Sequence, residues 1–213
     1  MHNKVYAIVD VDICDPEGYG GYLHRISPAL KSAGATYLVH GGPHKVLEGD
    51  WTPHRLFMME FGSMSAAREF YAGPEYCDRK DFRLACGSSN VVLVHGLEDV
   101  AASIRIDTKD EIDSAKGYVI FDVKIHDMQR YRDFMQCIKP IIESAGGGYL
   151  VRGGEHEVVE GDWYPDRLVV FEFPSVKNAE EFYFSDTYQG GAKKIRDECS
   201  SGKVVVVEGI TGA

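Results

Sequence analysis

The sequence of 213 residues lacks a hydrophobic segment long enough to cross a membrane, because no run approaches ~18 apolar residues. Its first residues also lack the charged-then-apolar pattern of a secretory signal peptide. Basic residues are few: 23 Lys and Arg stand against 33 Asp and Glu, and the net charge of −10 argues against binding a phosphate backbone. We therefore expect a cytoplasmic protein whose partner is a small-molecule substrate, with no nucleic acid and no membrane.

Cysteine is scarce, and the number of cysteines is odd. The five cysteines are an odd number, which predicts free thiols in a reducing compartment and no disulfide framework. The chain also has no glycine-rich dinucleotide motif, no phosphate loop, no Gly-x-Ser-x-Gly and no Cys-x-x-Cys. These absences argue against nucleotide cofactors and against serine-type hydrolysis.

What the sequence does contain is an internal repeat. Residues 4–84 align with residues 116–196 without a gap, and 35 of the 81 aligned positions are identical. The repeat is far longer than the ~20–50 residues of a solenoid unit. We predict two domains of one kind, with residues 1–97 as the first repeat, 98–115 as a linker and 116–213 as the second repeat.

Each repeat predicts the element order β-α-β-β-α-β. Asp15 is a suitable N-cap for the first helix, Gly34 ends that helix, and Ser63 can cap the second helix. The expected strands of the first repeat cover residues 5–11, 36–42 with continuation toward residue 46, 55–61 and 91–94. This order is the ferredoxin-like or split-βαβ arrangement.

A ferredoxin-like sheet has helices on one face only, so its other face needs a cover. The second copy is the obvious cover. We therefore predict an α+β fold in which two ferredoxin-like repeats, each with a four-stranded sheet, close face to face into an intramolecular α/β barrel. Such a chain would be a monomeric pseudo-dimer or a homodimer of it.

The most prominent motif is Glu-Gly-Asp-Trp-x-Pro-x-Arg, which occupies residues 48–55 and again 160–167. Gly-Gly precedes it, and Glu-Phe-x-Ser and Phe-Tyr follow it in both halves. With these motifs each half resembles the bacterial family called domain of unknown function 1330, in the dimeric α/β-barrel superfamily. The first half departs from the pattern at Gly73, where the second keeps Ser185.

This resemblance covers nearly the whole chain and implies the fold. It implies no single reaction, because the wider superfamily includes cofactor-free monooxygenases, isomerases, polyketide cyclases, dehydratases and haem enzymes.

The Glu-Gly-Asp-Trp motif has two interpretations. As a structural hairpin, it places Gly49 in a left-handed turn, and Trp51 and Trp163 pack at the core. As a functional site, it presents Arg55 and Arg167 to a substrate carboxylate. Glu48 or Glu160 could equally be the partner of that arginine.

Two histidines are identical in both halves and precede the motif. His44 and His156 are candidate proton-transfer residues, because the pKa of histidine suits proton transfer near neutral pH. With Glu60 or Glu172 they would catalyse an isomerisation, cyclisation or cofactor-free oxidation of a small organic, carboxylate-bearing molecule. Further expected substrate contacts lie on the mixed face of the sheet, namely Tyr6, Tyr118, Asp10, Asp122 and Arg152. Trp51 and Trp163 of the motif are expected substrate contacts as well.

Two alternatives remain open. If His40, His95 and Glu60 share one face of the sheet, they form a set for a divalent metal, iron or zinc, and would serve a metal-dependent oxygenase or lyase. The second half has Arg152 where the first has His40, so Arg152 would there neutralise Glu172 or Glu208. The other alternative is a non-catalytic small-molecule-binding module. We favour an enzyme.

Overall fold

Residues 4–97 and 115–211 are described by the computed structural model, and they form two compact units. The units do not coincide with the repeats, since each takes one segment from the other repeat. Of the described residues, the first unit contains 4–42, 52–97 and 154–164, and the second contains 43–51, 115–153 and 165–211. The predicted linker lies outside the described residues except for Ala115.

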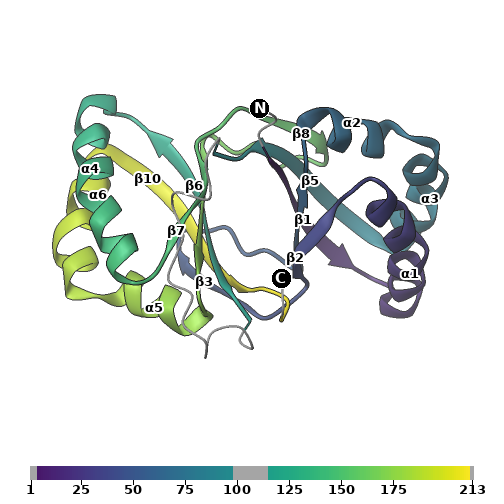
Figure 1. The fold of residues 1–213 in the computed structure, drawn as a ribbon, viewed down its shortest axis with the longest axis horizontal. Helices are drawn as coiled ribbons and strands as arrows, with labels where there is room; N and C mark the ends of the chain where they lie inside the picture. The colour runs from purple at the N-terminus through teal and green to yellow at the C-terminus, as the bar shows by residue number, and fades with distance from the viewer. Residues whose placement is uncertain (1–3, 98–114, 212–213) are drawn as a thin grey trace. The chain divides into compact units, whose positions relative to one another are not determined.

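The first unit is a five-stranded antiparallel sheet with helices on one face, α1, α2 and α3 (Figure 1). The helices are α1 (Pro16–Ser32), α2 (Met64–Ala72) and α3 (Pro74–Ala85). In sheet order the strands are β2 (Thr36–His40), β4 (Leu56–Phe61), β1 (Val5–Ile13), β5 (Gly87–His95) and β8 (His156–Glu160). The edge strand β8 comes from the second repeat.

The second unit repeats this plan. Its helical elements are α4 (Met128–Ser144), α5 (Val176–Phe184), the π-helix η2 (Tyr188–Ala192) and α6 (Lys193–Cys199). In sheet order its strands are β7 (Gly148–Arg152), β9 (Leu168–Phe173), β6 (Gly117–Ile125), β10 (Ser200–Glu208) and β3 (His44–Glu48). Here the edge strand β3 comes from the first repeat.

The predicted α+β class with two ferredoxin-like repeats is confirmed. The predicted continuous strand from residue 36 toward residue 46 is wrong, because it breaks into β2 and β3, which join different sheets. Gly41 makes the break with a left-handed φ of 68°, and Pro43 has no N–H to donate to a ladder. Each sheet consequently has five strands and not four. Closure of the two sheets into a barrel concerns the placement of the units and stays a prediction.

The predicted helix caps are confirmed. The Asp15 and Ser63 side chains accept hydrogen bonds from the backbone N–H groups of Gly18 and Ala66, which satisfies donors that the first helical turn leaves unpaired. Of the described residues, no helix is both long and apolar enough to cross a membrane. All five cysteines are free.

In the first sheet, one face packs against the helices and the other carries Tyr6, Asp10 and Glu60 of the predicted polar residues. Val5, Ala7 and Val9 of β1 belong to the core on the helix side. Tyr6 and Ile8 point to the opposite face and are also fully buried. Candidate residues can therefore meet only if they lie on the same face of the sheet.

Candidate functional site

A buried arginine anchors the exchanged strand in the first unit. Arg83 of α3 is only 3% exposed, and its guanidinium donates hydrogen bonds to Glu160 of β8 and to Ser89 of β5. Ser89 also donates to Glu160 over 2.9 Å, and Tyr76 donates to the other carboxylate oxygen over 3.3 Å. Burial opposes ionisation of Glu160, but Arg83 and these donors outweigh it and lower its pKa.

The second unit has the same arrangement. Arg196 of α6, 1% exposed, donates to Glu48 of β3 over 2.6 Å and to the Tyr188 hydroxyl over 3.0 Å. Tyr183 donates to Glu48 over 2.8 Å. A buried charge needs such partners. We call the two pairs, Arg83–Glu160 and Arg196–Glu48, the latches, because each ties a strand of one repeat to a helix of the other.

The latches settle the partner of the motif glutamate. Glu48 and Glu160 pair with Arg196 and Arg83, and not with the motif arginines Arg55 and Arg167. Sequence reasoning missed the latch arginines because the gap-free alignment pairs Arg83 with Ile195 and Leu84 with Arg196. Only a one-residue insertion between the repeats brings Arg83 and Arg196 to equivalent positions.

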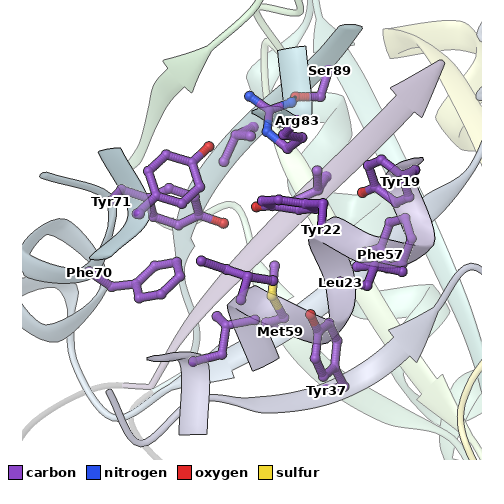
Figure 2. A pocket seen from close by; sticks show the side chains of 15 residues that line it. Tyr19, Tyr22, Leu23, Tyr37, Phe57, Met59, Phe70, Tyr71, Arg83 and Ser89 are labelled. Carbon is purple, nitrogen blue, oxygen red and sulfur yellow. The ribbon is translucent and has the colours of Figure 1, made fainter. Parts of the chain in front are cut away.

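A cavity of about 40 Å³ lies between helix and sheet in the first unit (Figure 2). Three tyrosines surround it from α1 and β2, namely Tyr19, Tyr22 and Tyr37. The rest of its polar lining is Tyr71 of α2, Tyr76 and Arg83 of α3, and Ser89 of β5. In Figure 2 the Tyr37 hydroxyl points toward Tyr22, and the Tyr22 hydroxyl toward Tyr71. The rest of the wall is mostly apolar, so the cavity suits a mainly apolar molecule with one or two oxygen atoms.

Four of these hydroxyls have no hydrogen-bond partner among the described residues: those of Tyr19, Tyr22, Tyr37 and Tyr71. Each hydroxyl is accessible from the cavity, because none of the four is among the fully buried polar atoms that lack a partner. Burial raises the pKa of all four and brings that of Tyr22 to about 12. At neutral pH the four groups are therefore hydrogen-bond donors and not bases.

The second unit has a cavity in the equivalent place, of about 20 Å³. Three arginines border it, Arg152 of β7, Arg167 and Arg196. Arg196 is neutralised by Glu48, but neither Arg152 nor Arg167 has a carboxylate partner among the described residues. Arg152 instead stacks 5.1 Å from the Tyr149 ring centre, and Arg167 donates to the Arg152 carbonyl over 3.0 Å.

Three substitutions account for the difference between the cavities. Phe134 replaces Tyr22, and Arg152 replaces His40. Val169 replaces Phe57, over which the Arg55 guanidinium lies at 5.8 Å. With the smaller valine, Arg167 borders its cavity, whereas Arg55 does not border the first one.

The predicted contacts Asp10 and Asp122 have a structural task. The Asp10 carboxylate accepts hydrogen bonds from the backbone N–H groups of His54 and Arg55, over 2.8 and 3.3 Å. Asp122 accepts the N–H of Asp166 over 3.0 Å. Each aspartate therefore fixes the loop that follows the motif proline.

The motif itself is also held to the sheet. Gly49 and Gly161 have φ values of 82° and 86°, as predicted for a left-handed turn. The backbone N–H of Trp163 donates to the Asn90 side chain over 3.1 Å. Trp51 and Trp163 are half-buried and border neither helix–sheet cavity.

Strand exchange changes which histidine shares a sheet with which glutamate. Strand register places His156 in one row with Val94, Tyr6 and Glu60. Three strand spacings separate His156 from Glu60, roughly 14 Å, which excludes direct proton transfer. His44 lies in the equivalent row with Tyr118 and Glu172. The catalytic assignment of these four residues stays a prediction without a supporting contact.

The two glutamates have lysine partners that the sequence did not suggest. Lys4 pairs with Glu60 at 2.7 Å, and Lys116 pairs with Glu172 at 3.0 Å. The expected pairing of Arg152 with Glu172 is wrong. Arg152 is in register with Val169, on the other face of the sheet, because the strand pairing shifts between Tyr149 and Val151.

The same shift disperses the predicted metal ligands His40, His95 and Glu60. A bulge after Tyr37 brings His40 into register with Phe57, and His95 is in register with Val5, both on the helix side. Glu60 is in register with Tyr6 on the opposite face. No group of three or more His, Cys, Asp or Glu residues in the described ranges could hold a metal ion. His40 packs edge-on against Tyr37 and Phe57, at 4.7 and 5.3 Å between ring centres.

Comparison with known proteins identifies the family. The profile of the family described as domain of unknown function, DUF1330, matches residues 4–97 and again 116–210. The chain therefore belongs to the DUF1330 family and carries two copies of its domain. No curated protein sequence matches the chain.

Solved structures show the same fold at low identity. A candidate monooxygenase from Lactobacillus acidophilus has 12% identity and a TM-score of 0.54, and the match covers 100% of this chain and 98% of that one. An anthrone oxidase-like protein has 13% identity and a TM-score of 0.54, over 99% and 92% of the two chains. A mutant chlorite dismutase from Candidatus Nitrospira defluvii has 9% identity and a TM-score of 0.58, over 97% and 90%.

Proposed function

We propose that the chain is an enzyme that oxidises a small aromatic molecule carrying a phenol or carbonyl oxygen, and that its site is the cavity of the first unit. The observation that carries this proposal is the group of four tyrosine hydroxyls, three of them on buried side chains, that make no hydrogen bond to the described residues and border one mainly apolar cavity. A ligand oxygen that accepts from them would supply the missing hydrogen bonds. Apolar neighbours such as Phe57, Met59 and Phe70 would contact the ring.

In this site the tyrosine hydroxyls would stabilise a negative charge on the substrate oxygen. Their raised pKa values keep them protonated, so they donate to a phenolate or enolate oxygen more strongly than to its neutral form. Donors aimed at a developing negative charge lower the barrier to forming it. Since the tyrosines are not bases, the proton of the substrate would leave to solvent, and the electron-rich anion that remains is the form that gives electrons to molecular oxygen. The likeness to a candidate monooxygenase and to an anthrone oxidase-like protein supports this class of reaction.

A ring system needs more space than the cavity has. About 40 Å³ accommodates roughly three water-sized molecules at 10–15 Å³ each, so α1 must move to admit a ligand. The first half of α1 suits such a movement. Gly18, Gly20 and Gly21 lie there, and each glycine costs a helix about 1 kcal/mol relative to alanine.

The test is oxygen consumption by the purified chain with anthrone as the probe. We expect protein-dependent consumption, and we expect Tyr22→Phe and Tyr37→Phe to reduce kcat/KM by about 3- to 10-fold each, the equivalent of one hydrogen bond. Both changes remove only an oxygen atom without a protein partner, so both variants should fold.

Tyr149→Phe is the matched control, since Tyr149 occupies the position of Tyr37 in the second repeat. It should leave the rate unchanged. Consumption no faster than in protein-free buffer would refute the proposed reaction. Equal rates in Tyr22→Phe, Tyr37→Phe and the unmodified chain would refute the proposed site.

A further inference from the structure

The cavity of the second unit has cationic groups that the proposed oxidation does not use. Arg152 and Arg167 border it without a carboxylate partner among the described residues, and the Nε of Arg167 is buried without a hydrogen bond. A buried donor left unpaired costs free energy, more so when it carries charge. An anion at this point would satisfy it.

The rest of the wall is apolar or aromatic. Phe134 and Ile138 of α4 contribute to it, as do Val169 and Phe171 of β9. An inorganic anion would gain nothing from these side chains. An arginine fork beside an apolar wall fits a carboxylate with a short hydrocarbon tail, because the guanidinium matches the planar carboxylate geometry.

We propose that the cavity of the second unit is a binding site for a small apolar monocarboxylate, which Arg167 and Arg152 hold by its carboxylate. The tail must be short, because the cavity measures about 20 Å³, room for about one water-sized molecule. Because Arg152 is exposed, its guanidinium can meet the carboxylate at the opening while the tail occupies the cavity. The site is independent of the oxidation proposed for the first unit.

The first unit explains why this specificity is confined to one cavity. At the equivalent positions Arg55 lies over Phe57 and His40 packs edge-on against Phe57. Among the described residues, the one cation that borders that cavity is therefore Arg83, which Glu160 neutralises. Burial, with a contribution from Arg55, lowers the pKa of His40 and leaves it neutral at pH 7. We therefore expect the first cavity to discriminate against anions that the second accepts.

The experiment is an NMR titration of the full chain with butyrate, observed at the arginine side-chain Nε–H signals. We expect saturable shifts of the Arg167 signal with millimolar affinity. Butyramide, a neutral analogue of equal size, should bind at least tenfold more weakly. Arg152→Gln and Arg167→Gln should each weaken butyrate binding about tenfold, the usual value of one charge-assisted hydrogen bond.

Two further variants keep the test decisive. Arg55→Gln is the matched control in the first repeat and should leave butyrate affinity unchanged. Val169→Phe fills the cavity with the side chain that the first repeat has there, and should abolish binding. The proposal is overturned by equal binding of butyramide, by unchanged affinity in Arg152→Gln, whose exposed side chain can be lost without unfolding, or by the absence of saturable shifts up to roughly 50 mM.

Discussion

The two helix–sheet cavities leave different polar groups without a protein partner. In the first unit these groups are neutral tyrosine hydroxyls, and in the second they are the Nε of Arg167 and the positive charges of Arg152 and Arg167, which have no carboxylate partner among the described residues. The latches beneath them are equivalent, since each joins a buried arginine to a glutamate of the other repeat. Duplication has therefore preserved what holds each unit together, whereas the chemistry of the cavity has diverged.

Removing the glutamate of each latch tests whether the two latches contribute equally to stability. We expect Glu160→Ala to lower the free energy of unfolding by about 3–5 kcal/mol, because it leaves the buried Arg83 without its counter-ion. Glu48→Ala should have a smaller effect in the same direction, because the Glu48 side chain is 24% exposed and that of Glu160 only 10%. Urea denaturation measures both.

The control lies on the same exchanged strand. Glu157 pairs with the exposed Arg68, so Glu157→Ala should cost about 1 kcal/mol or less. A loss for Glu157→Ala equal to that for Glu160→Ala would show that the strand tolerates no change of any kind, and the latch would then have no special importance.

The second prediction concerns the helices over the cavities. A Cβ at Gly20 or Gly21 of α1 meets no atom within 4 Å, so alanine should stabilise the unit by about 0.5–1 kcal/mol at each position through helix propensity. The second repeat has Arg132 and Asp133 there and lacks this weakness. Thermal unfolding measures the gain. If α1 must open for a ligand, the double alanine variant should also consume oxygen more slowly, and an unchanged rate would contradict that movement.

Most of the fold could be predicted from the sequence, because it depends on local signals that occur twice. The alternation of Val5, Ala7 and Val9, the caps at Asp15 and Ser63 and the turn at Gly49 act within a few residues. The exchange of β3 and β8 could not be predicted. Any antiparallel edge satisfies the hydrogen bonds of an extended segment, and only the distant latch arginines select the edge.

The candidate site was harder to predict for a related reason. Alternation along a strand assigns faces correctly only while the register is regular, and one bulge after Tyr37 turned His40 to the helix side. The prediction of Arg167 as a binding residue agrees with its place at a cavity, and the assignment stays a prediction. The sequence did not indicate Tyr22 and Tyr37 as site residues, because no local pattern reveals whether the hydroxyl of a tyrosine has a hydrogen-bond partner.

The smallest effect on stability is expected at Tyr22, where the second repeat has Phe134. Because the Tyr22 hydroxyl makes no hydrogen bond to the described residues, Tyr22→Phe should leave stability at pH 7 unchanged or raise it by about 0.5 kcal/mol. Tyr76→Phe is the contrast, since it loses the bond to Glu160 and should destabilise by about 1 kcal/mol.

The pH dependence provides a second measurement at the same residue. Burial raises the pKa of Tyr22 from 10 to about 12, so the folded chain holds this proton more tightly than the unfolded chain does. That contribution to stability is fully present below pH 10 and is lost as pH rises through about 12. Tyr22→Phe should therefore lose less stability than the unmodified chain between these values in urea denaturation. Parallel curves for the two proteins would mean that the Tyr22 hydroxyl is solvated in the folded state, and the cavity would then be open to water at this point.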